Sequence, residues 1–373
     1  MTAKEKAAEL LAIAGITFNG PARTDIQVHD DSAFDRMFAK GSLGVGESYM
    51  DGQWDVADMS GFFTKIFDAE LHTKVEKIGI LFHFLRSTLI NLQSPSRAHI
   101  VGERHYDIGN DLYQKMLDSR MVYSCGYWSA PLAPARNLEE AQEAKLDLIC
   151  KKLGLKPGQK ILDVGCGWGS FAKFAAEKYG VEVVGITISK EQAALARERC
   201  KGLPIEIRVE DYRTTTGTFD YIVSVGMFEH VGLKNYRTFF KKMKSLLKDD
   251  GLFLLHTIGS SVDLRTSDPW IEKYIFPGGL LPSVGQIGKA IDRQFIVEDW
   301  HNFGADYDTT LMAWYDNFER AWPTLQGKYD ERFRRMWRYY LMSMAGMFRS
   351  RGTHLWQIVL SKRGVHGGYR SVR

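Results

Sequence analysis

The sequence predicts an α/β protein in which a doubly wound, mainly parallel sheet follows a smaller, mainly helical domain. Two observations carry this prediction. From about residue 139 onward, short apolar runs alternate with helical patterns, and one of these runs leads directly into a glycine-rich turn. At 373 residues the chain also exceeds the usual size of one domain. We therefore expect a helical N-terminal domain at 1–92, a linker at 93–103 and the α/β domain at 104–373.

The first 92 residues read as helices joined by turns. The stretch 41–54 is rich in glycine and is expected to form turns, and the pattern at 73–90 is amphipathic and basic. We interpret 73–90 as a core helix of a small domain in preference to a membrane-touching helix. The polar run at 93–97 marks the linker. The helices expected in this part are 4–15, 34–38, 59–70 and 73–90.

The remainder alternates between strands and helices in the order that one seven-stranded α/β domain requires. The expected strands are 160–164, 181–187, 205–209, 219–225, 251–257, 294–301 and 354–361. The expected helices are 139–153, 170–179, 189–200, 234–247, 306–321 and 328–350.

The glycine-rich turn after the first expected strand indicates a nucleotide-type cofactor. Gly165, Gly167 and Gly169 form the pattern G-x-G-x-G, and Asp163 lies two residues before it, where its carboxylate can order the loop. A dinucleotide site would need G-x-G-x-x-G, so the third glycine comes one residue early. The segment resembles motif I of the Rossmann-like methyltransferases that use S-adenosylmethionine. A tight strand-to-helix turn without a ligand is the alternative.

The carboxyl ends of the next strands supply further cofactor candidates, because ligands of open parallel sheets bind at that edge. After the second strand, Thr187 stands where an acid usually grips the ribose hydroxyls, and Gln192 follows in the first turn of the next helix. After the third strand, Asp211 is a candidate for the adenine amino group and Tyr212 for stacking. A surface turn is the alternative for this last pair.

Composition bounds the location and excludes several site types. No apolar run reaches the roughly 18 residues that span a bilayer, and the first residues lack an apolar signal core, so a cytosolic protein is expected. The four cysteines show no C-x-x-C spacing, which argues against a zinc site or a disulfide framework. Residues 328–373 carry 11 Lys/Arg against two acids. This basic region could meet anionic phosphates or, equally, the acidic N-terminal part of the chain.

Six segments together resemble the bacterial cyclopropane-fatty-acyl-phospholipid synthases almost word for word, and the mycolic acid cyclopropane synthases more distantly. The resemblance covers nearly the whole chain. The segments are 44–52, 104–111, 121–128, 224–232, 254–260 and 302–310.

This resemblance implies that a methyl group passes from S-adenosylmethionine to a cis double bond of a phospholipid acyl chain, and that a bound bicarbonate ion takes the proton lost on ring closure. It assigns Tyr123 and Ser124 to the cofactor. It implies that backbone and side chains hold the bicarbonate; matched motif by motif, these are Cys125, Ile258, Glu229, His256 and Tyr307. Cys125 is expected to contribute its backbone and not a nucleophilic thiol. No metal is expected.

The resemblance also implies a homodimer at the inner face of the cytoplasmic membrane, with unsaturated phospholipids as partners. Two alternatives remain within lipid chemistry: methylation of the alkene, or of a sphingoid base, without ring closure. A catalytically inactive lipid-binding protein is a third. A nucleic-acid methyltransferase is disfavoured, because neither N-P-P-Y nor a catalytic C-x-x-C occurs.

Overall fold

The computed structural model describes residues 1–71 and 109–373, which form two compact units. We call them the helical unit and the sheet unit. The expected helix 73–90 and the linker 93–103 lie outside the described residues, so the domain boundary stays a prediction. The helical unit comprises 1–71, Arg265–Pro277 and Tyr307–Thr353, and the sheet unit 109–264, Gly278–Asp306 and His354–Arg373.

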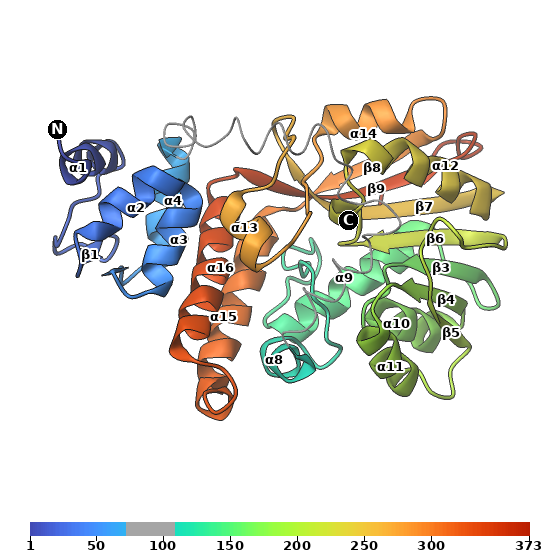
Figure 1. The fold of residues 1–373 in the computed structure, drawn as a ribbon. Coiled ribbons are helices and arrows are strands. Elements are labelled where there is room, and N and C mark those ends of the chain that lie inside the picture. Colours follow the sequence, from blue (N-terminus) through green and yellow to red (C-terminus); the bar gives the residue numbers. More distant parts are fainter. Residues whose placement is uncertain (72–108) are drawn as a thin grey trace. The chain divides into compact units, whose positions relative to one another are not determined.

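The sheet unit is built on a seven-stranded sheet with the order β5-β4-β3-β6-β7-β9-β8 (Figure 1). β3, β4, β5, β6 and β7 pair in parallel, whereas β8 and β9 pair antiparallel. This confirms the predicted α/β class and its seven strands. The strands are β3 (Lys160–Val164), β4 (Glu182–Thr187), β5 (Ile205–Val209), β6 (Phe219–Val225), β7 (Leu247–Ser260), β8 (Ile296–Asn302) and β9 (Thr353–Ser361).

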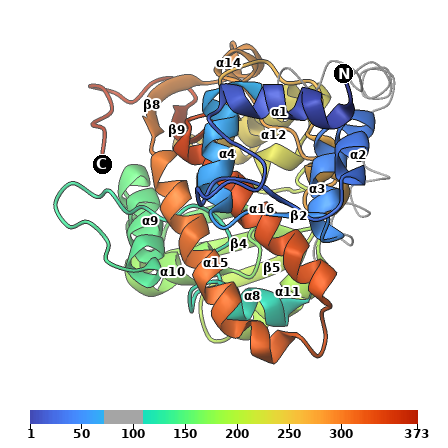
Figure 2. The ribbon, with the colours of Figure 1, turned by 90° about the vertical axis from the view of Figure 1, so that its left-hand side faces the viewer.

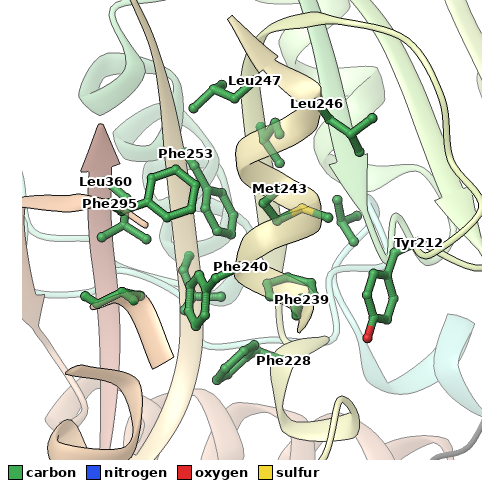
Figure 3. Close-up of a cluster of buried hydrophobic side chains, with 14 of the residues drawn as sticks. Tyr212, Phe228, Phe239, Phe240, Met243, Leu246, Leu247, Phe253, Phe295 and Leu360 are labelled. Atoms are coloured by element: carbon green, nitrogen blue, oxygen red, sulfur yellow. The ribbon is translucent and has the colours of Figure 1, made fainter. Parts of the chain in front are cut away.

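Helices cover both faces of this sheet because each central strand is apolar on both sides. Leu162 packs into the cluster under α12 and α14, where Phe240 meets Phe253 (Figure 3), and its neighbour Ile161 packs with Ile149 under α9 and α10. The helices of this unit are α8 (Asn110–Met116), α9 (Leu138–Leu153), α10 (Ser170–Tyr179), α11 (Lys190–Arg199), α12 (Tyr236–Leu246) and α14 (Val284–Ile291), with the 3₁₀ turns η2 (Phe228–His230) and η3 (Leu233–Asn235).

The helical unit joins N-terminal helices to two long helices from late in the sequence (Figure 2). α16 packs against α3 and α4, and its Tyr339 contacts Tyr49, Phe63 and Trp270. The sequence pattern assigns the helices 306–321 and 328–350 to the α/β domain. The alternation of strands and helices along the chain does not show that these two helices pack with the N-terminal helices. The elements are α1 (Ala3–Ile13), β1 (Gln27–Val28), α2 (Ser32–Lys40), α3 (Ser42–Met50), β2 (Trp54–Asp55), α4 (Met59–Asp68), α13 (Pro269–Tyr274), α15 (Ala305–Leu325) and α16 (Glu331–Arg349). The first two residues of α15 belong to the sheet unit, and the helical unit begins at Tyr307.

The expectation of turns at 41–54 is wrong, because α3 occupies most of that stretch. Its glycines serve close packing: a Cβ on Gly44 would collide with the carbonyl oxygen of Arg36, and one on Gly46 with the ring of Trp270. Glycine lowers helix propensity by about 1 kcal/mol, and tertiary contacts override that loss here. Within the described residues, no helix is long and apolar enough to cross a bilayer.

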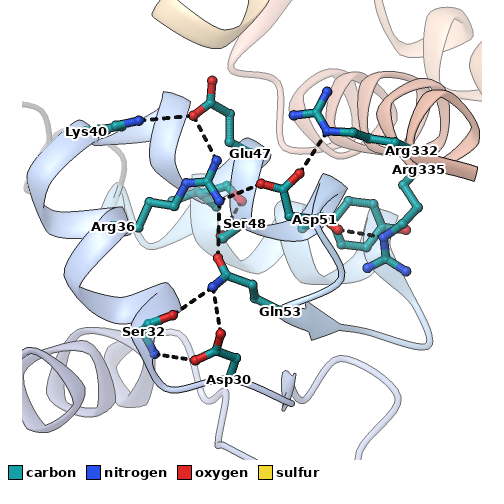
Figure 4. Close-up of polar contacts among 12 residues, drawn as sticks. Asp30, Ser32, Arg36, Lys40, Glu47, Ser48, Asp51, Gln53, Arg332 and Arg335 are labelled. Carbon is teal, nitrogen blue, oxygen red and sulfur yellow. Dashed lines mark hydrogen bonds and ion pairs between the residues drawn. The ribbon is translucent and has the colours of Figure 1, made fainter.

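Basic side chains of α16 pair with acids of the N-terminal segment, and Figure 4 shows the pair of Arg332 with Asp51. Arg332 contacts Asp51 at 2.8 Å and Arg335 contacts Asp55 at 2.8 Å. For Arg332 and Arg335, the structure therefore confirms the second interpretation of the basic region 328–373, an internal contact with the acidic N-terminal part of the chain. Arg373 belongs to the sheet unit and is likewise paired, with Asp299 at 2.6 Å.

Candidate active site

Three predicted site residues meet at the carboxyl ends of β6 and β7. Val225 pairs with His256 in the parallel register, and the chain then turns into η2, which carries Glu229. The backbone N–H of Ile258 donates to Glu229 Oε1 at 2.7 Å, and the N–H of Leu280 donates to the Glu229 carbonyl at 2.8 Å. The carboxylate is therefore fixed beside the strand that carries the histidine.

Two buried polar atoms remain unsatisfied in this group. Glu229 Oε2 and His256 Nε2 are buried and have no hydrogen-bond partner among the described residues. The side-chain amide of Gln357 lies 3.3 Å from His256 Nδ1 and occupies that nitrogen, which leaves Nε2 as the ring atom available to a ligand. Buried polar groups without partners are rare in proteins and indicate a ligand or water. A small anion that carries one hydroxyl, such as bicarbonate, would accept from His256 and donate to Glu229.

Burial sets the charge of both groups. Burial raises the pKa of Glu229 to about 7, and the hydrogen bond from the backbone of Ile258 opposes part of this rise. Burial also lowers the pKa of His256 well below its usual value, so the imidazole is neutral. A carboxyl group poised near pH 7 can either hold or release a proton under physiological conditions, as general acid–base chemistry requires.

The segment before the sheet is held by two buried side chains of α9. Gln142 Nε2 donates to the Ser124 carbonyl at 2.8 Å, and Lys145 Nζ donates to Ser124 Oγ at 2.7 Å. Both side chains are fully buried, and so is Cys125, whose thiol donates to the carbonyl of Gly126. Tyr123 packs on the ring of Tyr113, with centroids 5.1 Å apart.

Sequence reasoning missed Lys145, because lysines on a helix are normally solvated. Burial lowers its pKa to about 8, and its charge interacts favourably with Asp118 and Asp163. It also contributes to the lowered pKa of His256. Lys145 is thus a buried cation within electrostatic reach of the predicted anion site. The signal that the sequence offered was the spacing of Gln142 and Lys145, which lie three residues apart and therefore on the same, buried face of the helix.

We expect Lys145→Met to lower kcat/KM for S-adenosylmethionine roughly tenfold and to lower the free energy of unfolding as well, because it leaves the buried Asp118 and Asp163 without their positive partner. Enzyme kinetics and thermal unfolding measure the two effects. Gln142→Leu loosens the same segment, so its effect should not add to that of Lys145→Met. Full additivity in the double variant would contradict the shared role.

The glycine turn leaves open backbone where a cofactor would approach. Gly165, Gly167 and Gly169 all have positive φ, at 82°, 54° and 77°. A Cβ on Gly165 would lie 2.7 Å from Met227, whereas one on Gly167 would meet nothing within 4 Å. Asp163 is 2% exposed with one carboxylate oxygen unpartnered, and burial raises its pKa to about 7. These features fit a bound cofactor.

The other cofactor candidates have partners within the protein. Thr187 Oγ1 donates to Gln192 Oε1 at 3.0 Å and accepts from the backbone N–H of Ser189. Asp211 forms an ion pair with Arg213 at 2.8 Å, and Tyr212 packs in the core against Phe239. Their cofactor roles stay predictions.

Tyr307 lies in the helical unit, where its ring packs on Phe348 with centroids 4.5 Å apart. Its contribution to the anion site also stays a prediction. The preceding residue, Asp306, belongs to the sheet unit and accepts hydrogen bonds from the backbone of Trp128 at 2.6 Å and of Ser129 at 3.0 Å. Asp306 thus anchors the segment that begins at Cys125, a role the sequence did not reveal.

The sheet order, the glycine turn after β3 and the polar groups at the strand ends define a class I methyltransferase that uses S-adenosylmethionine. Solved structures agree: the mycolic acid cyclopropane synthase CmaA1 complexed with SAH and CTAB matches with a TM-score of 0.65 and 32% identity, over 71% of this chain and 98% of that one.

Sequence comparisons specify the family. The family model described as mycolic acid cyclopropane synthetase matches residues 93–358. The cyclopropane-fatty-acyl-phospholipid synthase of Escherichia coli (strain K12) is 54% identical over 98% of this chain and 94% of its own length. Sphingolipid C9-methyltransferase A of Emericella nidulans is 33% identical over 76% of this chain and 57% of its own. The chain belongs to the cyclopropane synthase family of S-adenosylmethionine-dependent methyltransferases, which act in lipid cyclopropane synthesis.

Proposed function

We propose that this enzyme converts cis double bonds of phospholipid acyl chains into cyclopropane rings. The observation that carries the proposal is the buried pair of unsatisfied groups, Glu229 Oε2 and His256 Nε2, at adjacent strand ends of a cyclopropane synthase. Similarity to the Escherichia coli phospholipid enzyme over nearly the whole chain supports the phospholipid substrate.

The reaction adds one methyl carbon and closes a three-membered ring. S-adenosylmethionine supplies the methyl group when bound, and bicarbonate would take the proton that leaves the new methyl carbon. The alkene is a weak nucleophile, so the protein must orient it in a dry apolar channel. Phe303 lies next to His256, with centroids 5.9 Å apart, and Tyr127 packs on Phe303 with centroids 5.1 Å apart; these rings offer aromatic faces that stabilise positive charge on the acyl chain.

Within this proposal, each site residue has one task. His256 would donate a hydrogen bond from Nε2 to one oxygen of the anion, and Glu229 would accept a hydrogen bond from the anion's hydroxyl, which would orient a lone pair of the anion toward the substrate. The backbone near Cys125 and Ile258 and the hydroxyl of Tyr307 complete the binding set by family resemblance. Lys145 supplies a buried positive charge that balances the anion.

The test is incubation of the full chain with S-adenosylmethionine and vesicles of an unsaturated phospholipid, with and without bicarbonate. We expect a mass gain of about one CH₂ per alkene together with upfield ring-proton signals in NMR, and a rate that depends on bicarbonate. Cofactor binding without any acyl product on several unsaturated lipids would contradict the proposal.

A second candidate is methylation of a lipid without ring closure, favoured by the similarity to sphingolipid C9-methyltransferase A. A cyclopropane and a methyl-branched alkene have the same mass, so mass alone does not separate them. Loss of olefinic protons with gain of ring methylene signals would support cyclopropanation, and a retained olefinic signal would support the alternative.

We further propose that the enzyme works as a homodimer, peripherally bound at the inner face of the cytoplasmic membrane. Two weak membrane contacts in one dimer reinforce each other through effective concentration. Light scattering at working concentration measures the oligomeric state. A monomer that is fully active on vesicles would contradict the dimer.

We expect Cys125→Ser to keep at least about a third of the wild-type activity. The proposed contact uses the backbone, and the thiol is buried and donates to the neighbouring carbonyl of Gly126. A serine hydroxyl can make the same hydrogen bond. Initial rates on vesicles measure the effect, and near-total loss of activity in a folded variant would reveal a chemical role for the thiol.

A further inference from the structure

A basic stripe runs along α12 on the side that borders α14. Arg237, Lys241 and Lys244 follow each other at spacings of four and three residues, which places them on one side of the helix. Lys244 Nζ reaches the carbonyl of Arg293, just beyond α14, at 3.3 Å, and Lys289 of α14 adds a further exposed cation. The two helices pack side by side on the sheet (Figure 1).

No acid on α12 or α14 offsets this stripe, and Asp292, which follows α14, lies 3.9 Å from Arg293. The segment 233–248 holds six basic residues and no acidic one, and α14 holds no acid either. Within 1–71 and 109–373, Arg237, Lys241, Lys244 and Lys289 form no ion pair. The C-terminal basic residues Arg332 and Arg335 differ, because each is paired with an acid of its own unit. These four cations therefore form one group of unpaired positive charge on α12 and α14.

Exposed apolar side chains lie next to this stripe at the edge that carries the site. Val262 is 62% exposed and Val284, the first residue of α14, is 54% exposed. Their segments are tied together, since Ser260 bridges to Ser283 and Gln286 Nε2 donates to the carbonyl of Leu264 at 3.0 Å. Val262 follows the end of β7, four residues after Ile258.

We propose that this surface, the stripe Arg237, Lys241, Lys244 and Lys289 with the tip Val262 and Val284, docks on an anionic phospholipid bilayer. Unpaired cations match the negative surface of such a membrane, and the apolar tip can enter the headgroup boundary. Nucleic acid would complement the cations, but its phosphate backbone offers no apolar environment for the exposed valines. The contact brings the carboxyl edge of the sheet to the leaflet that holds the acyl substrate.

Vesicle flotation without S-adenosylmethionine tests the surface. Arg237→Gln, Lys241→Gln and Lys244→Gln are combined in one variant of the full chain. Its matched control combines Lys156→Gln, Lys190→Gln and Lys201→Gln, which removes the same charge from exposed lysines that form no ion pair with any other described residue. We expect the stripe variant to bind vesicles with 30% phosphatidylglycerol roughly 100-fold more weakly than wild type, and the control to bind within threefold of it.

A labelled variant tests the tip. The four native cysteines are buried, so Val262→Cys can carry an environment-sensitive dye, with Ile296→Cys as the control at a 47% exposed position of β8. A blue shift on anionic vesicles at Val262 alone supports insertion. Equal binding by wild type and the stripe variant, or tighter wild-type binding to duplex DNA than to the vesicles at matched salt, would overturn the proposal.

The inference rests on the proposed function only for its choice of lipid, and the two can fail separately. Activity of the stripe variant on substrate in neutral detergent micelles should match wild type, while activity on anionic vesicles should fall. If wild type makes no acyl product anywhere but still binds vesicles through the stripe, the proposed function fails and the docking surface stands.

Discussion

Glu229→Gln should lower kcat roughly 10³-fold while it makes the protein more stable at pH 8. The loss of activity is expected because the amide group of glutamine would place an NH₂ group at the position of Oε2, and NH₂ cannot accept a hydrogen bond from the hydroxyl of the proposed anion. Groups that take part in acid–base catalysis contribute about 10² to 10⁴ in rate. Product formation on vesicles at saturating S-adenosylmethionine measures it. The amide keeps an oxygen for the N–H of Ile258, so the local fold is preserved.

The stability change follows from proton linkage. Burial raises the pKa of Glu229 from 4.5 to about 7. Between these values the unfolded chain is ionised while the folded chain holds the proton, so this group's contribution to stability falls as pH rises through the interval. Above pH 7 the buried charge costs up to about 3 kcal/mol, which the glutamine variant avoids. Below about pH 4.5 both states are protonated and the two proteins should be equally stable.

Denaturant unfolding of both proteins at pH 5 and pH 8 tests this prediction, with Glu206→Gln as a control at an exposed carboxylate of β5. The control should keep its activity within twofold and show no gain at pH 8. An active Glu229→Gln, or one that is less stable than wild type at pH 8, would show that the carboxylate has a structural role instead. In wild type, kcat/KM should fall as pH drops below about 7, where Glu229 takes up a proton.

The sequence predicted those parts of the fold that depend on local patterning. Short apolar runs bounded by turn residues gave every strand of the sheet, and the glycine spacing indicated the cofactor turn. α14 was missed although its start carries a readable signal, the capping box of Ser283 and Gln286. α3 could not be found locally, because its glycines are explained only by contacts with distant segments such as Trp270.

The candidate site shows the same division. Glu229, Ile258 and His256 come from motifs at strand ends, and a parallel sheet brings such ends together. Lys145 and Asp306 act through contacts with the segment 124–129, which lies far from Asp306 in the sequence. A single sequence does not show whether a lysine on a helix faces solvent or the interior. The packing of α16 against α3 and α4 could not be predicted for a related reason, because the aromatic face of α16 can pack against either a sheet or other helices.

Gly167→Ala should weaken S-adenosylmethionine binding about 100-fold or more while the protein remains folded. Gly167 has φ 54°, and a Cβ there would meet no protein atom within 4 Å. The substitution therefore adds a methyl group only to the open side of the turn, where the cofactor backbone contact is proposed. The left-handed conformation costs an alanine about 1 to 2 kcal/mol wherever it occurs.

Gly202→Ala separates the two effects, because Gly202 has φ 85°, also meets nothing within 4 Å and follows α11, outside the segment Gly165–Gly169. Both variants should lose similar unfolding free energy, and only Gly167→Ala should lose cofactor affinity in titration calorimetry. Gly165→Ala is less informative, since its Cβ would also strike Met227 at 2.7 Å. Equal cofactor affinity in the Gly167 and Gly202 variants would place the cofactor elsewhere, because the turn would then tolerate a methyl group on its open side.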